Sequence, residues 1–438
     1  MLNPAASTAI RWRLFAILFG FGLLAYVQQK TITVAAEPMM PALGLNQTQI
    51  GFIEQAFVIG YAVFQMPGGL IGQRLGARVA FVVIELVAFA ATIAMPIVPE
   101  VASGQGLFAA LMGVQLLLGV SQGGIFPISS GVFEAWFPPN RWAFVQGMQT
   151  AGLGLGAALT PPLIVHLMAA LGWQRGLVWA SLPALGLIAV WAWYGRNTPR
   201  EHPSISRGEL ELIGSQPQAD SAIRWRALGS QILSRNVLVL FVSYMCMNYT
   251  FYLLSNWVFL YLVEERHQSL FHSGWLTTVV QLGAALGAGL GGSLTGTLCE
   301  RLGNRWGYRI VPLVAMSSAA LLLLAGVSVS NPYVAVAVLA LCFLAVELNE
   351  GAFWGAAMTV GRGDTMAVCG FINTGGNLGG IIALPIVGHL ADLHLWHTAF
   401  LIGVGFALAS AFGWLFIEVA ETTPKPAAAL VDTPAGAY

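Results

Sequence analysis

The chain has 438 residues, of which 57% are hydrophobic and only 9% are charged, and its formal net charge is zero. Soluble domains carry about 25% charged residues, so this composition indicates a surface that faces lipid. The balanced charge argues against a nucleic-acid partner. The four cysteines lie in or beside apolar runs without CxxC spacing, which argues against a disulfide framework.

The apolar runs predict an all-α membrane protein with twelve transmembrane helices. A membrane-spanning helix needs about 20 mostly apolar residues. By this criterion, spans are expected near residues 12–35, 49–71, 79–98, 106–128, 143–168, 174–195, 236–262, 272–298, 309–328, 332–359, 366–390 and 396–418. No small-residue cleavage site ends the first apolar run, so we expect a retained span and not a signal peptide.

A polar segment that contains several prolines divides the spans into two groups of six. The predicted organisation is an N-terminal six-helix bundle (1–195), a linker (196–235), a C-terminal six-helix bundle (236–420) and a disordered tail (421–438). A short surface helix is expected near residues 208–214 of the linker.

The same basic glycine turn follows the second span of each group. It reads Gln-Arg-Leu-Gly-Ala-Arg at 73–78 and Glu-Arg-Leu-Gly-Asn-Arg at 300–305, with four of six positions identical. A phrase repeated at the same place in both groups indicates an internal duplication. The duplication predicts two related halves with a substrate path between them.

The basic residues predict the orientation of the chain. Most of them fall on one side of the predicted layout; only Arg175 and Arg266 fall on the other, and Lys30 lies within a span. By the positive-inside rule, both termini and the linker are expected in the cytoplasm. We therefore expect a multi-pass protein of the cell (inner) membrane, embedded in the lipid bilayer as a monomer.

Several segments in chain order carry a resemblance to a known family. They are Tyr26 with 31–36, 60–69, Phe126-Pro127, Trp136-Phe137-Pro138, Pro199 with 201–203, Phe353-Trp354 and 373–380. Together they resemble the major facilitator superfamily, and within it the anion:cation symporter branch that transports sugar acids, hexuronates and sialic acid. The resemblance implies that two six-helix bundles rock about a central site and import a small organic anion together with protons.

Glutamines stand where the resemblance implies charged residues. Gln73 replaces an acid of the basic turn, and four more lie on the first and fourth spans: Gln28, Gln29, Gln115 and Gln122. The family's charges bind the substrate carboxylate and carry the proton, whereas a glutamine neither titrates nor supplies charge. The alternatives are therefore an uncoupled facilitator or a carrier of a neutral polar solute, and, from another class, a transport-incompetent nutrient sensor.

Lys30 is the only basic residue deep in a span, and it shares a helical face with Tyr26. A charge at membrane depth costs at least about 2.5–3.5 kcal/mol on insertion scales, so its presence indicates a structural or functional role. We expect Lys30 to anchor an anionic substrate. The alternatives are a structural ion pair with an acid such as Glu54, or a side chain that reaches the membrane interface.

Three acids remain as candidates for proton coupling. Glu347 and Glu350 share a face of the tenth span with Trp354, and Glu54 lies on the second span. A carboxyl group in a cavity of low dielectric can load and release protons. The alternative is that these are buried acids with satisfied hydrogen bonds. Glu85 has no polar companion on its face and is expected to be structural.

Other polar residues within the spans are expected to line the substrate path. The resemblance implies this role for Tyr61, Trp354, Asn373 and Asn377. A four-residue period on the seventh span suggests it for Asn248, Tyr252 and Asn256, and polar faces of the N-terminal half suggest it for Tyr26, Gln29, Gln122 and Gln149. The alternative for each is a core residue that is hydrogen-bonded to another helix.

The two basic turns are expected to form a conformational gate. Its residues are Gln73, Arg74, Arg78, Glu300, Arg301 and Arg305, and the arginines would lock the cytoplasmic face in the outward-open state. Gln73 lacks the family's charge, which predicts a weaker lock and a larger inward-open population. No nucleotide-binding motif, metal-ligand spacing or catalytic constellation is found, so we expect neither an enzyme nor a cofactor or metal.

Overall fold

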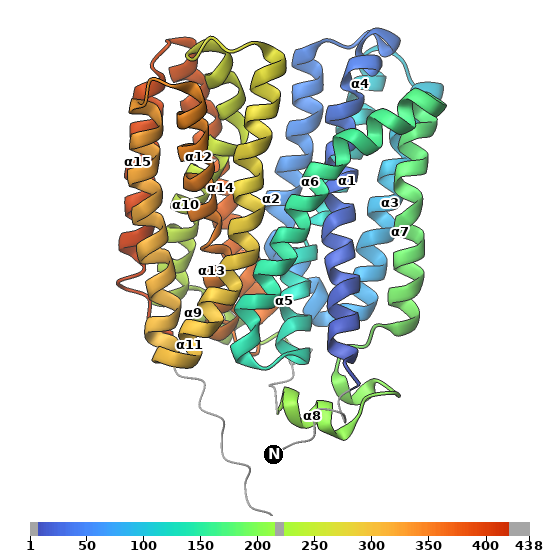
Figure 1. Cartoon of the computed structure of the whole chain (residues 1–438). Coiled ribbons are helices and arrows are strands. Elements are labelled where there is room, and N and C mark those ends of the chain that lie inside the picture. The colour runs from blue at the N-terminus through green and yellow to red at the C-terminus, as the bar shows by residue number, and fades with distance from the viewer. Residues whose placement is uncertain (1–7, 215–222, 420–438) are drawn as a thin grey trace, which may run out of the picture.

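The computed structural model describes residues 8–214 and 223–419, so the predicted disordered tail (421–438) lies outside the described residues. The described chain is a bundle of long helices (Figure 1). They are α1 (Ile10–Leu43), α2 (Gln47–Leu75), α3 (Ala77–Val101), α4 (Gly104–Gln122), α5 (Ile125–Trp136), α6 (Trp142–Leu171), α7 (Trp173–Tyr194), α8 (Arg207–Ile213), α9 (Trp225–Ile232), α10 (Arg235–Glu264), α11 (Leu270–Ser328), α12 (Pro332–Glu347), α13 (Glu350–Val360), α14 (Thr365–Asp392) and α15 (Trp396–Gly413), with short 3-10 turns η2 (Pro139–Arg141) and η3 (Pro199–Glu201).

The described residues contain eleven helical stretches that are long and apolar enough to cross a membrane. Two of these are helix pairs, since α4 continues into α5 and α12 into α13. The longest, 57 residues, turns back at Gly303, where the backbone leaves the helical region with φ 77° and ψ 166°. Divided at that glycine, the eleven stretches become the twelve spans that the sequence predicts.

Gly76 and Gly303 give the duplicated turn its shape. Gly76 ends α2 with φ 78° and ψ 148°, close to the angles of Gly303. A positive φ strains residues that carry a Cβ atom, so both copies of the turn need glycine at this place. The repeat seen in the sequence is thus also a repeat of backbone conformation.

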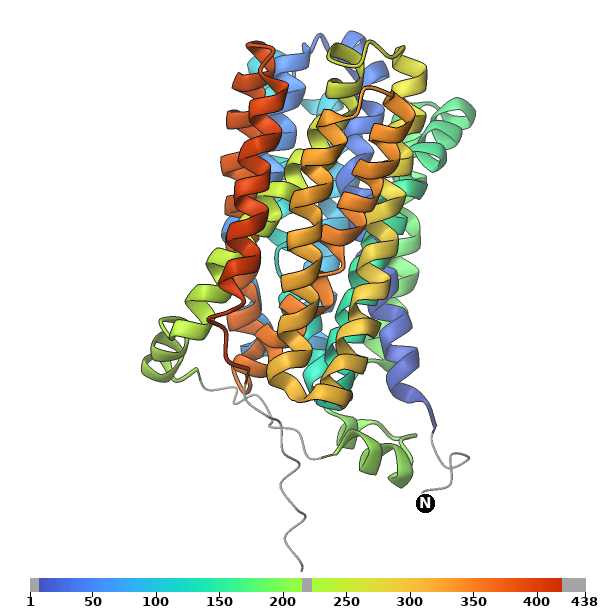
Figure 2. The ribbon, with the colours of Figure 1, turned by 60° about the vertical axis from the view of Figure 1, so that its left-hand side comes forward.

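The linker helices lie at one end of the bundle, which we call the linker end (Figure 1 and Figure 2). The short helix expected near 208–214 is α8. Its Glu209 is buried, and its carboxylate accepts hydrogen bonds from the backbone N–H groups of Ile10 and Arg11 and from the hydroxyl of Thr8. A carboxylate at a helix N-terminus satisfies orphan donors and complements the helix dipole. Glu209 therefore ties the linker to the start of α1.

The two halves meet through α6 against α11 and α13, and through α2 and α5 against α14. Glycines allow this close approach. A Cβ atom on Gly292 of α11 would lie 2.4 Å from the carbonyl oxygen of Ala143 on α6, and one on Gly351 of α13 would lie 2.8 Å from the same oxygen. The interface is therefore built from backbone surfaces in direct contact.

Candidate functional site

Several hydrogen bonds between described residues join the two halves. They include Gln73–Asp364, Asn140–Glu300, Glu134–Gly363, Gln65–Asn373 and Thr374–Ala62. All lie between the middle of the bundle and the linker end, because α2 runs toward that end and α14 starts there. The halves are therefore closed at the linker end in this conformation.

Polar side chains from both halves meet near the middle of the bundle. Tyr252 of α10 interacts electrostatically with Tyr26 of α1 and Tyr61 of α2, and Tyr61 lies within hydrogen-bonding reach of Gln65 and Asn373. The three tyrosines are only partly buried. The structure thus brings these predicted site residues together on one partly accessible surface shared by the halves.

Lys30 lies beside this group, and no described side chain supplies a counter-ion for it. Its ammonium is 5.7 Å from the ring centre of Tyr26, its side chain is partly buried, and it forms no ion pair with any described residue. No ion pair between Lys30 and Glu54 is found in this conformation, so the structural pair with a buried acid stays an alternative without support from Glu54. Glu54 is partly buried as well, and Gln29, next to Lys30, remains partly exposed.

Gln28 and Gln122 form a buried amide pair between α1 and α4. The amide of Gln122 donates to the side-chain oxygen of Gln28 over 2.9 Å and to the carbonyl of Ala25 over 3.2 Å. Its side chain is only 2% exposed. In this conformation the donors of Gln122 are used inside the N-terminal half, so its role in lining the substrate path stays a prediction.

Gln149 is also a core residue. It is fully buried, and its amide donates to the hydroxyl of Ser129 over 2.7 Å, as Gln146 does to Ser130 over 2.7 Å. These bonds hold α6 against α5. Gln149 therefore positions a helix of the N-terminal half and does not present its amide to the surface between the halves.

Glu350 lies at the contact between the halves. Its carboxylate accepts hydrogen bonds from the hydroxyl of Tyr244 (3.0 and 3.3 Å to the two oxygens) and the indole N–H of Trp354 (2.8 Å), and Thr150 of α6 lies within reach. The ring of Trp354 is 5.6 Å from that of Phe126 on α5. One carboxylate thus connects donors of the C-terminal half with side chains of the N-terminal half.

The remaining C-terminal candidates lie on α10, α12 and α14. Glu347 is buried and interacts electrostatically with Glu350. Asn377 accepts a 3.4 Å hydrogen bond from the hydroxyl of Tyr252. The amides of Asn248 and Asn256 donate to carbonyls of their own helix, so the predicted polar stripe on α10 offers mainly its side-chain oxygens.

The closed linker end uses different residues from the predicted arginine lock. Arg78 donates to the carbonyl of Ala192 on α7, within its own half, and Arg74 stacks over the ring of Trp225 at 5.7 Å. Arg301 and Arg305 are exposed and form no hydrogen bond across the halves among the described residues. In this conformation Arg78 holds α3 against α7 and does not bridge the halves, so its role in the lock stays a prediction.

Of the predicted gate residues, Gln73 and Glu300 do bridge the halves. Gln73 donates to Asp364 over 2.8 Å, and Glu300 accepts from Asn140 over 2.8 Å. Sequence reasoning missed Asp364, Asn140 and Glu134, whose carboxylate accepts from the backbone N–H of Gly363 over 3.2 Å. Asp364 and Asn140 lie in polar breaks between spans, which is the one signal that could have pointed to them.

Comparison with known proteins identifies the family. The model of the Major Facilitator Superfamily matches residues 18–363. The chain belongs to the major facilitator superfamily. It is similar to a probable sulfoacetate transporter of Cupriavidus necator (28% identical, covering 92% of this chain and 93% of the relative) and to a hexuronate transporter of Bacillus subtilis (26%; 96% and 98%). A probable galactarate/D-glucarate transporter of Escherichia coli is 22% identical (98% and 99%).

Solved structures of the superfamily share the fold. The Escherichia coli fucose:proton symporter superimposes with a TM-score of 0.70 (15% identity, covering 94% of this chain and all of the other), and a proton:xylose symporter with 0.71 (15%; 97% and 98%). The predicted family and fold class are confirmed. This superfamily member is a multi-pass membrane transporter related to organic-anion carriers, and not an enzyme.

One buried acid lies apart from the site of this transporter. Glu85 of α3 is fully buried, and neither carboxylate oxygen has a hydrogen-bond partner in the described part of the chain. It has no contact with Glu350 or with the tyrosines between the halves. Glu85 therefore provides a matched control for substitutions of buried acids.

Proposed function

We propose that this chain imports a small organic anion, a sugar acid or a related carboxylate, together with protons, by alternating access between its two halves. The observation that carries the proposal is Lys30. It is a cation inside a span without a carboxylate partner among the described side chains, next to Tyr26 on the surface where both halves meet. A buried cation without a counter-ion is costly unless a ligand supplies the charge.

The names of the relatives support the substrate class. Sulfoacetate, hexuronate, galactarate and glucarate all carry at least one carboxylate on a small polar skeleton. Lys30 would take the anionic group, while Tyr61, Tyr252, Asn373 and Asn377 would bind hydroxyls through neutral donors and acceptors. An oxygen-rich solute suits such a mixed surface better than an apolar acid.

Glu350 is the proposed proton carrier. Importing an anion against an inside-negative potential costs about 2.3 kcal/mol per charge per 100 mV, and one co-transported proton removes that cost. Glu350 binds Tyr244 and Trp354 of its own half and lies within reach of Thr150 of the other, so its protonation state acts directly on their contact. Glu347, and Glu54 near the other end of α2, are secondary candidates.

Uptake into proteoliposomes tests both residues. Labelled hexuronate, galactarate and sulfoacetate would be offered with and without an inward proton gradient. Lys30→Gln should abolish binding and uptake of the acids, whereas Glu350→Gln should retain binding but lose the response to the gradient. Glu85→Gln is the matched control and should behave like the parent. Acid binding that persists in Lys30→Gln would contradict the proposed anchor.

An uncoupled facilitator is the second candidate, and a specific observation favours it. The pair Gln28–Gln122 is neutral at positions where the resemblance implies acids, so the N-terminal half offers no titrating group there. If the acids equilibrate across the liposome membrane without moving protons, the proposed proton coupling is contradicted. The proposed anion-binding site at Lys30 is not affected by that result.

The proposal includes the orientation expected from the basic residues. Both chain ends and the linker would lie in the cytoplasm of the inner membrane, the protein would act as a monomer, and the bundles would divide at residues 195 and 236. The linker end would then be the cytoplasmic end. Labelling of single cysteines introduced in α8 and in the α3–α4 turn, from each side of the membrane, tests the orientation.

A further inference from the structure

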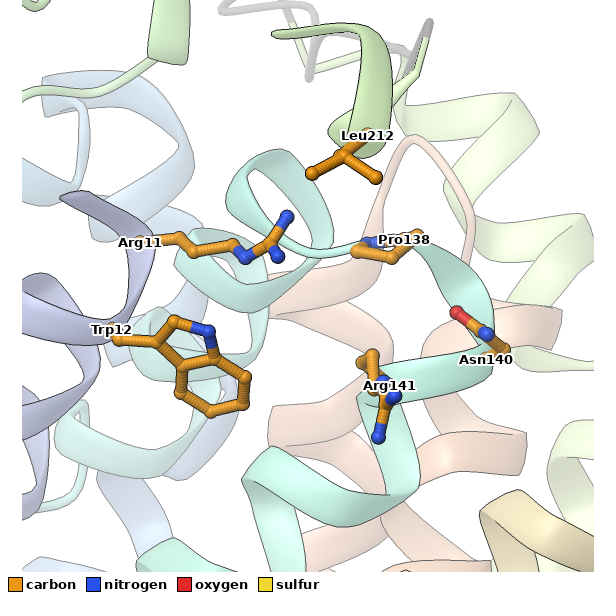
Figure 3. A pocket seen from close by; sticks show the side chains of 6 residues that line it. All are labelled: Arg11, Trp12, Pro138, Asn140, Arg141 and Leu212. Carbon is orange, nitrogen blue, oxygen red and sulfur yellow. The ribbon is translucent and has the colours of Figure 1, made fainter. Parts of the chain in front are cut away.

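A pocket lies at the linker end of the N-terminal half, apart from the polar surface between the halves. Its volume is about 480 Å³, and it is lined by Arg11, Trp12, Pro138, Asn140, Arg141 and Leu212. Figure 3 shows that these side chains come from three segments: the start of α1, the turn between α5 and α6, and α8 of the linker. The pocket is therefore complete only when the linker is docked on the bundle.

The two arginines of this pocket have no acidic side-chain partner among the described residues. The Nε atom of Arg11 is enclosed without a hydrogen-bond partner, and neither Arg11 nor Arg141 forms a side-chain ion pair with a described residue. The acids nearby are already engaged. Glu209 accepts from backbone N–H groups at the start of α1, and Glu300 accepts from Asn140. Two cationic side chains with spare donors thus line one cavity.

Apart from Asn140, the rest of the lining is apolar. Trp12 forms one wall, and Leu212, 44% exposed, stands at the rim. Arginine presents a planar fork of donors that matches phosphate oxygens, and tryptophan is enriched where membrane proteins meet the lipid headgroups. Arg11 and Trp12 open the first membrane-spanning stretch, so the pocket lies at the depth of an interface.

We propose that this pocket binds a phosphate group, supplied by the headgroup of an anionic phospholipid. Arg11 and Arg141 hold the phosphate, and Trp12 and Leu212 pack against the glycerol and the first acyl carbons. The volume lies within the range of small-ligand sites and exceeds what a bare phosphate needs. Asn140 lies in the same pocket and bonds Glu300 of the other half over 2.8 Å, so an occupied pocket stabilises the closed linker end.

The test uses the purified full-length protein in detergent. Phosphatidylglycerol, phosphatidylcholine and inorganic phosphate are titrated separately, with melting temperature and the number of lipids retained in native mass spectrometry as readouts. Phosphatidylglycerol should raise the melting temperature by about 2–4 °C and remain bound. The double variant Arg11→Gln/Arg141→Gln should lose both effects. Arg200→Gln removes an exposed charge from the same end outside the pocket and should keep them.

The separate titrations distinguish a lipid headgroup from free inorganic phosphate as the source of the phosphate group. If inorganic phosphate stabilises the parent but not the double variant, while phosphatidylglycerol adds nothing, the phosphate site stands and the lipid source is overturned. Equal stabilisation of the parent and the double variant, or none by either ligand, overturns the proposal.

A second variant guards against loss of folding in the arginine variants. Leu212→Glu places a carboxylate at the exposed rim without removing any hydrogen bond. It should fold like the parent and retain less phosphatidylglycerol. Unchanged retention in Leu212→Glu, combined with misfolding of the arginine variants, overturns the pocket as the binding site.

Discussion

Gln73 donates a hydrogen bond to the carboxylate of Asp364 over 2.8 Å, from one half of the transporter to the other. The bond joins the basic turn after α2 to the loop before α14. Gln73 is 5% exposed, so water competes little with the bond. An amide at position 73 is therefore matched to an acid at position 364, and this pair helps to keep the linker end closed.

Gln73→Asp should open the linker end. The substitution removes the donor and sets two carboxylates against each other. Loss of a hydrogen bond to a charged group costs about 1.5–3 kcal/mol, a change of roughly 10- to 100-fold in the ratio of open to closed protein. Distances between spin labels on α2 and α14 at the linker end would measure that ratio.

The double variant Gln73→Asp/Asp364→Asn is the control for this prediction. It reverses donor and acceptor and should recover much of the closed population. From the sequence, an acid at position 73 predicts a stronger lock. A shift of Gln73→Asp toward the closed form would support that expectation and contradict the role that the structure gives to Asp364.

Gly292→Ala should also disfavour closure at the linker end. The new Cβ atom would lie 2.4 Å from the carbonyl oxygen of Ala143, and a backbone atom of α6 cannot yield without moving the helix. Overpacking of this kind costs about 1–3 kcal/mol. Gly289→Ala on the same helix is the control, because its nearest neighbour would be 3.7 Å away. The same spin-label distances would measure the ratio of open to closed protein in both variants. Equal ratios would show that the interface accommodates the extra Cβ atom and would contradict the prediction.

Glu209→Ala should release the linker from α1. It removes an acceptor for two backbone N–H groups, and the loss of a helix cap costs about 0.5–2 kcal/mol. Hydrogen exchange should accelerate at residues 10–13 and in α8. Glu211→Ala changes an exposed acid of the same short helix and should leave exchange unchanged. Equal protection in both variants would contradict the capping role.

The fold can be predicted from the sequence because its strongest features are patterns of residues that are neighbours in the chain. Runs of apolar residues predict twelve spans, and the repeated glycine turn predicts two halves. The turn is confirmed by the shared positive φ of Gly76 and Gly303. Each of these features depends on neighbouring residues alone, so no knowledge of packing is needed to read them.

The site is less predictable because it depends on which face of a helix meets which neighbour. Spans that are apolar on every side give no clear buried face, so Gln122 and Gln149 could not be told from residues that line the path. The partner of Gln73 lies 291 residues further along the chain, and no local pattern points to it. The same holds for Arg78. The sequence shows that it lies in the turn, but not that its side chain binds α7.

His202 should make the docking of the linker sensitive to acid. Burial, and next the positive charge of Arg196, lower the pKa of His202, and its Nδ1 accepts a hydrogen bond from the backbone N–H of Ser204, which requires the neutral ring. The unfolded linker therefore binds the proton more readily. The stabilisation is complete above the unfolded pKa of about 6.5 and is lost as the pH falls toward the folded pKa.

Hydrogen exchange of residues 196–213, corrected for intrinsic rates between pH 8 and pH 5, should show loss of protection in the parent. His202→Phe keeps the ring against Tyr194 and cannot titrate, so its protection should not change with pH. The same acid response in His202→Phe would assign the effect to another group.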